Sequence, residues 1–118
     1  MTRALKTMPW QLWVVDFGVP LGHEQAGVRP VIVVGSPGHC ALAIDVMLVV
    51  PLTTRDRGLR HHVRIDSESS GLHRPSWART EEVRTISTER LTQSAPIGKA
   101  SAEEIDELRK WLRAMVAF

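Results

Sequence analysis

The segment GHEQAGVRPVIVV, residues 22–34, joins a glycine-bounded polar loop to the start of a buried strand. Arg29 stands before Pro30, whose ring fixes its own φ and biases Arg29 toward extended backbone. The guanidinium therefore leaves the strand at a defined angle, and a planar cation held in this way suits a phosphate. Gly22 and Gly27 let the backbone approach a ligand closely. The same pattern is also typical of an ordinary polar hairpin connection.

The size of the chain, 118 residues and 13.2 kDa, predicts one domain over residues 1–118 with its own core. Cys40 is the single cysteine, so no disulfide can form within the chain. The opening residues lack a signal peptide's apolar region, and the longest apolar run, around 44–52, is too short to cross a membrane. We expect a cytoplasmic protein with no membrane association.

Positive charge gathers in one segment, although the net charge of the chain is only +2. The stretch RDRGLRHHVR, residues 55–64, holds four arginines and two histidines against one aspartate. Such a patch suits a polyanion, and a solvated loop is an equally good interpretation on charge alone. The chain has no tyrosine and two phenylalanines, so an aromatic platform for bases would have to use tryptophan or histidine.

Short runs of β-branched and apolar residues, separated by glycine and proline, indicate strands. The clearest runs are residues 12–17, 31–34, 44–52 and 61–66, with shorter candidates at 76–78 and 83–86. Their close spacing favours an antiparallel barrel or a curled sheet. A single helical turn is expected to begin at Ser87.

The last segment of the chain carries the clearest helix signal. Ser101 and Glu104 have the spacing of a capping box. Apolar residues then recur at helical spacing: Ile105, Leu108, Trp111, Leu112, Met115 and Val116. We expect this stripe to pack on the core of the sheet, with a partner surface as the alternative.

Several blocks, in their order along the chain, resemble the MazF/PemK/Kid family of messenger RNA interferases, the toxins of bacterial type II toxin–antitoxin pairs. The blocks are LWVVDFG (12–18), GHEQAGVRPVIVV (22–34), VVPLTT (49–54), EEVRTIS (81–87), Arg90 with Leu91, and the closing helix. The resemblance implies a mainly β fold, a small SH3-like antiparallel β-barrel with a C-terminal helix. It also implies a sequence-selective endoribonuclease that cleaves single-stranded messenger RNA and inhibits translation and growth.

The resemblance implies two protein partners in addition to the RNA. Members of the family work as homodimers whose RNA groove crosses the subunit interface. The cognate antitoxin, MazE-like or PemI-like, places a flexible and often acidic tail in that groove. The basic segment 55–64 is compatible with such a tail.

The family's catalytic residues carry over onto five positions of this chain. Arg29 matches the arginine that contacts the scissile phosphate, and Thr53 matches the threonine that supports the transition state. His23, Arg79 and Glu81 match the histidine and the Arg-x-Asp pair of the Kid-type members. Glu81 departs from that pattern, because the family has aspartate there and the extra methylene moves the carboxylate.

Further residues near these positions are expected to contact the RNA. They are Glu24, Gln25, Thr54, Arg55, Arg57, Arg60 and Arg84.

The sequence departs from the family at two further places, which concern the shape of the groove and the base preference. The sequence Pro9, Trp10 and Gln11 replaces a common Arg-Gly-Glu, and the Asn-Arg often found between the second and third strands is missing.

Metal-free cleavage of RNA uses the 2′-hydroxyl as internal nucleophile and leaves a 2′,3′-cyclic phosphate and a 5′-hydroxyl. It needs a base, an acid for the departing 5′ oxygen and cations for the phosphate. Glu81 is the expected base and Arg29 the expected cation. His23 and Arg79 are rival acids: guanidinium loses its proton only far above neutral pH, whereas imidazole titrates near neutral pH. We expect no cofactor.

Each candidate also has an ordinary structural interpretation. Glu81 with Arg84 would form a surface ion pair, which contributes little to stability. Thr53 with Thr54 would cap the turn after a strand. The tryptophans are expected in the core or in an interface, with Trp77 the candidate for base stacking.

The histidines are the candidates for a metal site, and their spacing argues against one. His61 and His62, as neighbours on one strand, are expected to face opposite sides of the sheet and not to share an ion. His39 near Cys40 offers only two ligands in a loop. The sequence therefore predicts no metal.

Two other functions stay open. The same barrel resembles the CcdB gyrase poisons, but their C-terminal Trp-Gly-Ile is absent from the ending at 115–118. The other is a binding module without catalysis, which applies if Glu81 cannot take the place of the family's aspartate. Incubation with RNA in EDTA separates these functions, because only the enzyme cuts.

Overall fold

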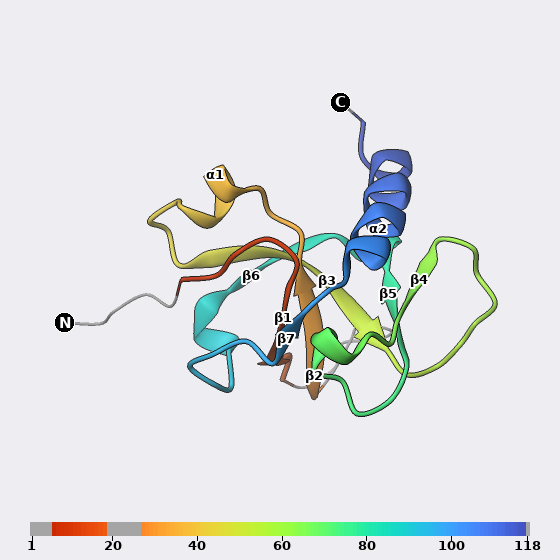
Figure 1. Cartoon of the computed structure of the whole chain (residues 1–118). Coiled ribbons are helices and arrows are strands. Elements are labelled where there is room, and N and C mark those ends of the chain that lie inside the picture. The colour runs from red at the N-terminus through yellow and green to blue at the C-terminus, as the bar shows by residue number, and fades with distance from the viewer. Residues whose placement is uncertain (1–5, 19–26, 118) are drawn as a thin grey trace.

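The computed structural model describes residues 6–18 and 27–117, which form a seven-stranded antiparallel sheet with a helix near the C-terminus (Figure 1). The strands are β1 (Gln11–Asp16), β2 (Val28–Val33), β3 (Val46–Thr53), β4 (His62–Ile65), β5 (Ser76–Arg79), β6 (Arg84–Ser87) and β7 (Gly98–Lys99). The helices are α1 (Pro37–Cys40) and α2 (Ala102–Met115), with 3-10 turns η1 (Glu68–Ser70), η2 (Thr80–Glu82) and η3 (Thr88–Arg90). Among these described residues, no helix has the length and apolar character needed to cross a bilayer.

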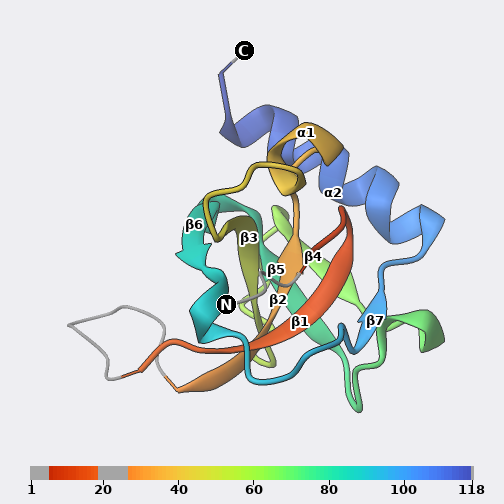
Figure 2. The ribbon, with the colours of Figure 1, turned by 90° about the vertical axis from the view of Figure 1, so that its left-hand side faces the viewer.

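Strand β3 organises the sheet because it pairs along both of its edges. One edge pairs with β2, where Val50 lies opposite Ile32. On the other edge, residues 46–49 pair with β6, and Leu52 and Thr53 pair with β5. The sheet, ordered β4-β5-β3-β2-β1-β7, therefore forks at β3 and curls (Figure 2). The mainly β fold expected from the sequence is confirmed.

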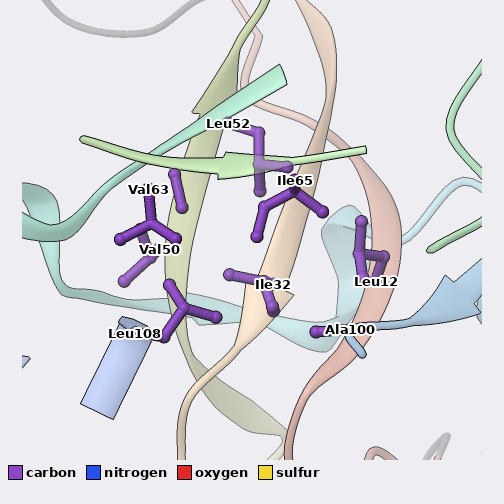
Figure 3. Packing of buried hydrophobic residues seen from close by; sticks show 9 residues of the cluster. Leu12, Ile32, Val50, Leu52, Val63, Ile65, Ala100 and Leu108 are labelled. Atoms are coloured by element: carbon purple, nitrogen blue, oxygen red, sulfur yellow. The ribbon is translucent and has the colours of Figure 1, made fainter. Parts of the chain in front are cut away.

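Helix α2 packs on one face of the sheet. Leu108 is fully buried beside Ile32 and Val50 (Figure 3). The other helix residues packed against this cluster are Ile105, Trp111 and Leu112. The apolar stripe of the helix is thus part of the core, as predicted, while Met115 and Val116 at its end are 39% and 43% exposed.

The opposite face of the sheet, which we call the second face, has its own apolar cluster. Strand alternation directs Trp13 and Val15 of β1 to this face, together with Val31 of β2 and Val49 of β3. Leu91, which forms a bridge with Val15, packs against the same cluster. The sheet therefore carries an apolar cluster on each side: α2 packs on one cluster, and Cys40 and Leu91 pack against the other.

Glu104, in the first turn of α2, is a buried carboxylate saturated with hydrogen bonds. The Ser101 hydroxyl accepts from the Glu104 amide and Glu104 Oε1 accepts from the Ser101 amide at 2.9 Å, which confirms the capping box. Glu104 Oε2 also accepts from the amides of Asp66 at 2.8 Å and Ser67 at 3.0 Å. Burial alone would raise the pKa of this carboxyl, but the hydrogen bonds from Ser101, Ser67 and Asp66 lower it below its usual 4.5.

Several strand ends differ from those predicted. β2 begins at Val28 instead of residue 31, so Arg29 lies inside the strand. β3 begins at Val46 instead of residue 44, because Asp45 has a φ of 54°, in the left-handed region that a strand cannot use. The helical turn expected at Ser87 is η3, for which the Ser87 side chain forms the N-cap.

Candidate active site

Strand pairing brings Arg29, Thr53 and Trp77 into one row across the sheet. Val31 lies opposite Pro51 in the last pair between β2 and β3, and Arg29 and Thr53 each lie two residues beyond that pair, on the same side of their strands. Thr53 is paired with Trp77 of β5. Paired residues point to the same side of a sheet, and Val31, two positions from Arg29, points to the second face. The row therefore lies on the second face, away from α2.

Arg79 and Glu81 continue the site at the end of β5. Arg79 ends that strand two residues beyond the tryptophan of the row, on the same side, and is paired with His62 of β4. The turn η2 follows at once, and it is fixed by the Thr80 hydroxyl, which donates to the His61 carbonyl at 2.6 Å. This turn directs Glu81 back toward the start of β4.

Glu81 is the centre of a charged cluster. Its Oε1 lies 3.1 Å from His61 Nε2 and 2.9 Å from His62 Nε2. Its Oε2 accepts a hydrogen bond from Arg79 Nη2 at 3.4 Å, and the same guanidinium donates to Glu82 Oε1 at 3.2 Å. The Glu81 side chain is 34% exposed, whereas that of His62 is 1% exposed. Glu81 is thus an accessible carboxylate held by a buried histidine.

The pKa of the Glu81 carboxyl is lowered below its usual 4.5. Burial has the largest single influence and would raise the pKa. A hydrogen bond from its own backbone amide and the charges of His62, Arg79 and His61 together outweigh burial. Glu81 is therefore ionised at neutral pH and can accept a proton.

His62 is a neutral histidine that orients Glu81. Burial lowers the pKa of His62 below its usual 6.5, although the charge of Glu81 and its hydrogen bond oppose this shift. A carboxylate only accepts hydrogen bonds, so His62 Nε2 carries the proton in the bond to Glu81. Nδ1 of the same ring is buried and has no hydrogen-bond partner among the described residues.

The prediction that His61 and His62 face opposite sides of a strand is wrong. β4 begins at His62, and His61 lies in the preceding turn, so strand alternation does not relate the two residues. Their rings meet edge to face with centroids 4.8 Å apart, and both Nε2 atoms point to Glu81. His61, His62 and Glu82 were therefore missed as partners of the catalytic candidates. The sequence signal for these contacts was the pair of adjacent histidines at the start of β4.

Thr53 combines an ordinary structural contact with its place in the row. It is 9% exposed, and its hydroxyl oxygen accepts from the Arg55 amide at 3.2 Å. This is the turn cap of the ordinary interpretation. The hydroxyl proton is still available to a ligand, because accepting a hydrogen bond uses only an oxygen lone pair.

The loop between β3 and β4, residues 54–61, which we call the basic loop, carries most of the described residues that were predicted to bind RNA. Thr54, Arg55, Arg57 and Arg60 are all exposed there. The loop projects from the side of the molecule (Figure 1). None of these arginines forms an ion pair with an acid in the described part of the chain. Their positive charge is therefore not neutralised there.

Two further arginines lie over aromatic rings. Arg84 of β6, which was also predicted to bind RNA, lies 5.2 Å from the centroid of the Phe17 ring. Arg64 of β4 lies 5.7 Å from the centroid of Trp77, with which it is paired. Trp77, the member of the row that lies on β5, is half-buried, so part of this residue reaches the surface.

The remaining predicted site residues, His23, Glu24 and Gln25, lie outside the described residues. Of the five catalytic candidates, Arg29, Thr53 and Arg79 share the second face, and Glu81 contacts Arg79. Cations such as these arginines can stabilise the charge on a phosphodiester, and an ionised carboxylate can accept the proton that is removed during its cleavage.

The described residues match a known protein family over almost their full length. The model for the PemK-like, MazF-like toxin of type II toxin–antitoxin systems matches residues 8–116. The chain is 32% identical over 108 residues to Endoribonuclease MazF9 of Mycobacterium tuberculosis, covering 87% of this chain and 90% of that protein. It is 28% identical over 109 residues to Endoribonuclease EndoA of Bacillus subtilis, covering 91% and 94%. The chain belongs to this toxin family, and both relatives have the enzyme class expected from the sequence.

Solved structures of the family share the fold. MazF from Deinococcus radiodurans matches with a TM-score of 0.75 and 22% identity, covering 92% of this chain and 94% of that one. An endoribonuclease from a mycobacterial species, in complex with its cognate antitoxin, matches with a TM-score of 0.75 and 16% identity, covering 92% and 93%. The expected barrel-like sheet with a C-terminal helix is confirmed.

Proposed function

We propose that this protein is a toxin that cleaves single-stranded messenger RNA in the cytoplasm without a metal ion and so inhibits translation and growth. The strongest support is the common location of Arg29, Thr53 and Arg79 on the second face, with Glu81 against Arg79. In the reaction, the 2′ oxygen bonds to phosphorus and the bond from phosphorus to the 5′ oxygen breaks. The products are a 2′,3′-cyclic phosphate and a 5′-hydroxyl.

Glu81 is the proposed base that removes the proton of the 2′-hydroxyl. Its lowered pKa makes it a weak base in the free protein, because a base is most effective when its pKa is near the working pH. A phosphate that draws Arg79 away removes one of the charges that lower this pKa. Bound RNA also excludes water from the carboxylate, which raises the pKa further. Substrate binding therefore adjusts the base toward its task.

Glu81 is one methylene longer than the family's aspartate, and contacts in the structure hold its carboxylate in place. His62 holds Glu81 Oε1 at 2.9 Å from a ring that is almost fully buried. Arg79 holds the other carboxylate oxygen. These two contacts support the proposal that Glu81 takes the aspartate's role despite the extra methylene.

Arg29 and Thr53 are proposed to stabilise the transition state at the phosphate. Arg29 is held within β2, so its charge needs little rearrangement when negative charge develops on the phosphate oxygens. The Thr53 hydroxyl lies in the same row and can donate a hydrogen bond to one of them.

His23 is proposed to donate the proton to the departing 5′ oxygen, with Arg79 as the rival. Arg79 already donates to Glu81 and Glu82. Its position between two carboxylates favours an electrostatic role. An imidazole exchanges protons near neutral pH.

The RNA is proposed to cross the second face and to continue along the basic loop. Residues proposed to contact it are Glu24, Gln25, Thr54, Arg55, Arg57, Arg60 and Arg84. Trp77 extends this surface, since its half-exposed indole lies beside Arg64 and can stack on an unpaired base.

We propose two protein partners, a second copy of the chain and a MazE-like or PemI-like antitoxin. The related structures include a MazE–MazF complex from Deinococcus radiodurans. The exposed basic loop suits the acidic tail of such an antitoxin.

For the dimer, the exposed apolar residues Leu42 and Ile44, which are 50% and 58% exposed, offer apolar contact area. The stripe of α2 does not support dimerisation, because it packs on its own sheet. Sedimentation at micromolar concentration tests the dimer, and a fully active monomer would contradict a shared groove.

The cleavage reaction is tested by incubating the purified protein with a long transcript in EDTA. We expect cutting to persist, the ends to be 2′,3′-cyclic phosphate and 5′-hydroxyl, and a 2′-deoxy substitution at the cut position to block it. Loss of cutting in EDTA that a divalent ion restores would reject the mechanism. Binding of RNA without cutting would identify an inactive module. Inhibition of gyrase would identify the CcdB-like alternative, which the matching family and relatives disfavour.

A further inference from the structure

We propose that His61, His62 and Glu81 form a binding site for a divalent transition-metal ion such as Zn²⁺, and that the bound ion inhibits RNA cleavage. In the described part of the chain, these are the residues that bring three potential ligand atoms together, all within 4.8 Å of one another. The metal site follows from these contacts alone. The inhibition rests on the proposed role of Glu81 as the base.

Two of the three distances between the donor atoms are close to those around a tetrahedral ion. Zinc with ligand bonds of about 2.0–2.1 Å separates neighbouring ligand atoms by about 3.3 Å. Glu81 Oε1 lies 3.1 Å from His61 Nε2 and 2.9 Å from His62 Nε2. All three atoms lie within 4.8 Å of one another, so movements of the half-exposed His61 and Glu81 side chains are needed to bring them onto one ion.

The chemistry of the ligands selects the kind of ion. Two imidazole nitrogens and one carboxylate oxygen suit zinc and its neighbours in the first transition row, whereas magnesium and calcium prefer oxygen ligands alone. Glu81 and Glu82 together outnumber the single positive charge of Arg79, which lies between them. Within this contact group the acids exceed the arginine by one charge, which favours a cation, while the arginines of the preceding loop oppose it.

Burial fixes one ligand and leaves an entrance at the other two. The side chain of His62 is 1% exposed, while those of His61 and Glu81 are 26% and 34% exposed. An ion can therefore enter from solvent, with water as the fourth ligand. Binding requires the His62 tautomer with its proton on Nδ1. That atom has no partner among the described residues, so moving the proton there breaks no hydrogen bond at Nδ1.

The bound ion would act on the reaction through Glu81 Oε1. Coordination to zinc withdraws electron density from the carboxylate, which makes Glu81 a weaker base for the proton of the 2′-hydroxyl. The ion also places positive charge where the carboxylate must become neutral. Zinc should therefore compete with catalysis while EDTA leaves the enzyme active.

Direct binding tests the site without reference to RNA. We would titrate the folded protein with Co²⁺, following visible absorption, and with Zn²⁺ by calorimetry. One ion should bind per chain, and His61→Gln and Glu81→Gln should each weaken binding at least tenfold, because each removes one of three ligands. His73→Gln, which changes an exposed histidine outside the cluster, should leave the affinity unchanged. These variants avoid the buried His62, so circular dichroism should show a normal fold.

Equal affinity in wild type and His61→Gln would overturn the metal site. For inhibition, single-turnover cleavage is compared in Zn²⁺ and in EDTA. Inhibition at the zinc concentration that saturates the site supports the proposal, and unchanged cleavage by the saturated protein would overturn its inhibitory part. A protein that binds zinc but never cuts RNA would refute the proposed function and leave the metal site standing.

Discussion

Glu104 and Glu81 are two partly buried carboxylates, both with a lowered pKa, in different parts of the molecule. Glu104 accepts hydrogen bonds from backbone amides and a serine hydroxyl, which tie the start of α2 to residues 66–67. Glu81 contacts two histidines and an arginine, and its side chain is 34% exposed. A lowered pKa therefore does not by itself mark a functional group.

The groups that contact each carboxylate distinguish the structural role of Glu104 from the catalytic role proposed for Glu81. Backbone amides are fixed neutral donors, so Glu104 can only hold the fold in place. The guanidinium of Arg79 carries charge, and this side chain can exchange partners and turn toward a ligand, so Glu81 can change its pKa when a substrate binds. We therefore expect changes near Glu81 to alter catalysis, and changes at Glu104 to alter stability.

Among the changes made outside Glu81, the largest effect is expected for Arg29→Ala. Loss of a preorganised cation at the phosphate should lower the single-turnover rate on the order of 10³-fold. The fold should persist, because Arg29 belongs to neither apolar cluster. Arg113→Ala, on the exposed part of α2, is the matched control and should cut normally. Wild-type rates in a folded Arg29→Ala protein would refute the phosphate contact.

Glu104→Gln should lower the free energy of unfolding by about 1–3 kcal/mol, because an amide keeps one acceptor oxygen for the donors that two carboxylate oxygens now satisfy. Urea denaturation at pH 7 measures this loss. Glu107→Gln, at an exposed position of the same helix, should change stability by no more than about 0.5 kcal/mol. Equal effects of the two variants would show that the buried contacts do not stabilise the fold.

The dependence of stability on pH follows from the same carboxylate. The pKa of Glu104 in the folded chain lies below the usual 4.5, so its stabilising contribution is complete above pH 4.5. It is lost as the pH falls through the lower folded value. Denaturation curves at decreasing pH should therefore show a decline below pH 4.5 that is shallower in Glu104→Gln. Parallel declines in both proteins would contradict the assignment.

The pH–rate profile separates His23 from Glu81. In kcat/KM, which reports the free enzyme, the lowered pKa of Glu81 keeps this base ionised above pH 4.5, so its limb of the profile lies on the acidic side of that value. A limb near neutral pH, where activity falls as the pH rises, should come from an acid such as His23 and should disappear in His23→Gln. If the limb persists in that variant, His23 is not the acid.

The smallest effect is expected in the basic loop. Arg60→Ala should weaken binding of single-stranded RNA a few-fold and reduce the slope of log affinity against log salt by about 0.7, the value for one phosphate contact. Lys110→Ala, on exposed α2, is the control. An unchanged salt slope would mean that Arg60 does not contact the RNA.

Local sequence signals predicted most of the fold. The capping box of Ser101 and Glu104, the apolar stripe of α2 and the principal strands were all visible, because each depends on residues close together in the chain. The strand ends were less accurate where a single backbone conformation decides, as at Asp45.

The catalytic candidates came from a family resemblance, and their surroundings were not predictable. The contact between His62 and Glu81 joins residues 19 positions apart, and that from Ser67 to Glu104 joins residues 37 apart. No local pattern fixes such contacts. The prediction about His61 and His62 failed because it assumed that the strand included His61, which lies in the preceding turn where strand alternation does not apply.

The most direct measurement compares Glu81→Gln with Glu104→Gln in single-turnover cleavage at equal concentrations of folded protein. In Glu81→Gln the new amide oxygen can still accept from His62, so that variant should fold normally, bind RNA normally and cut on the order of 10²- to 10⁴-fold more slowly. Glu104→Gln should cut at nearly the wild-type rate and be less stable. Normal cleavage by Glu81→Gln would contradict the assignment of the base, and His23 would then be the candidate if His23→Gln is inactive.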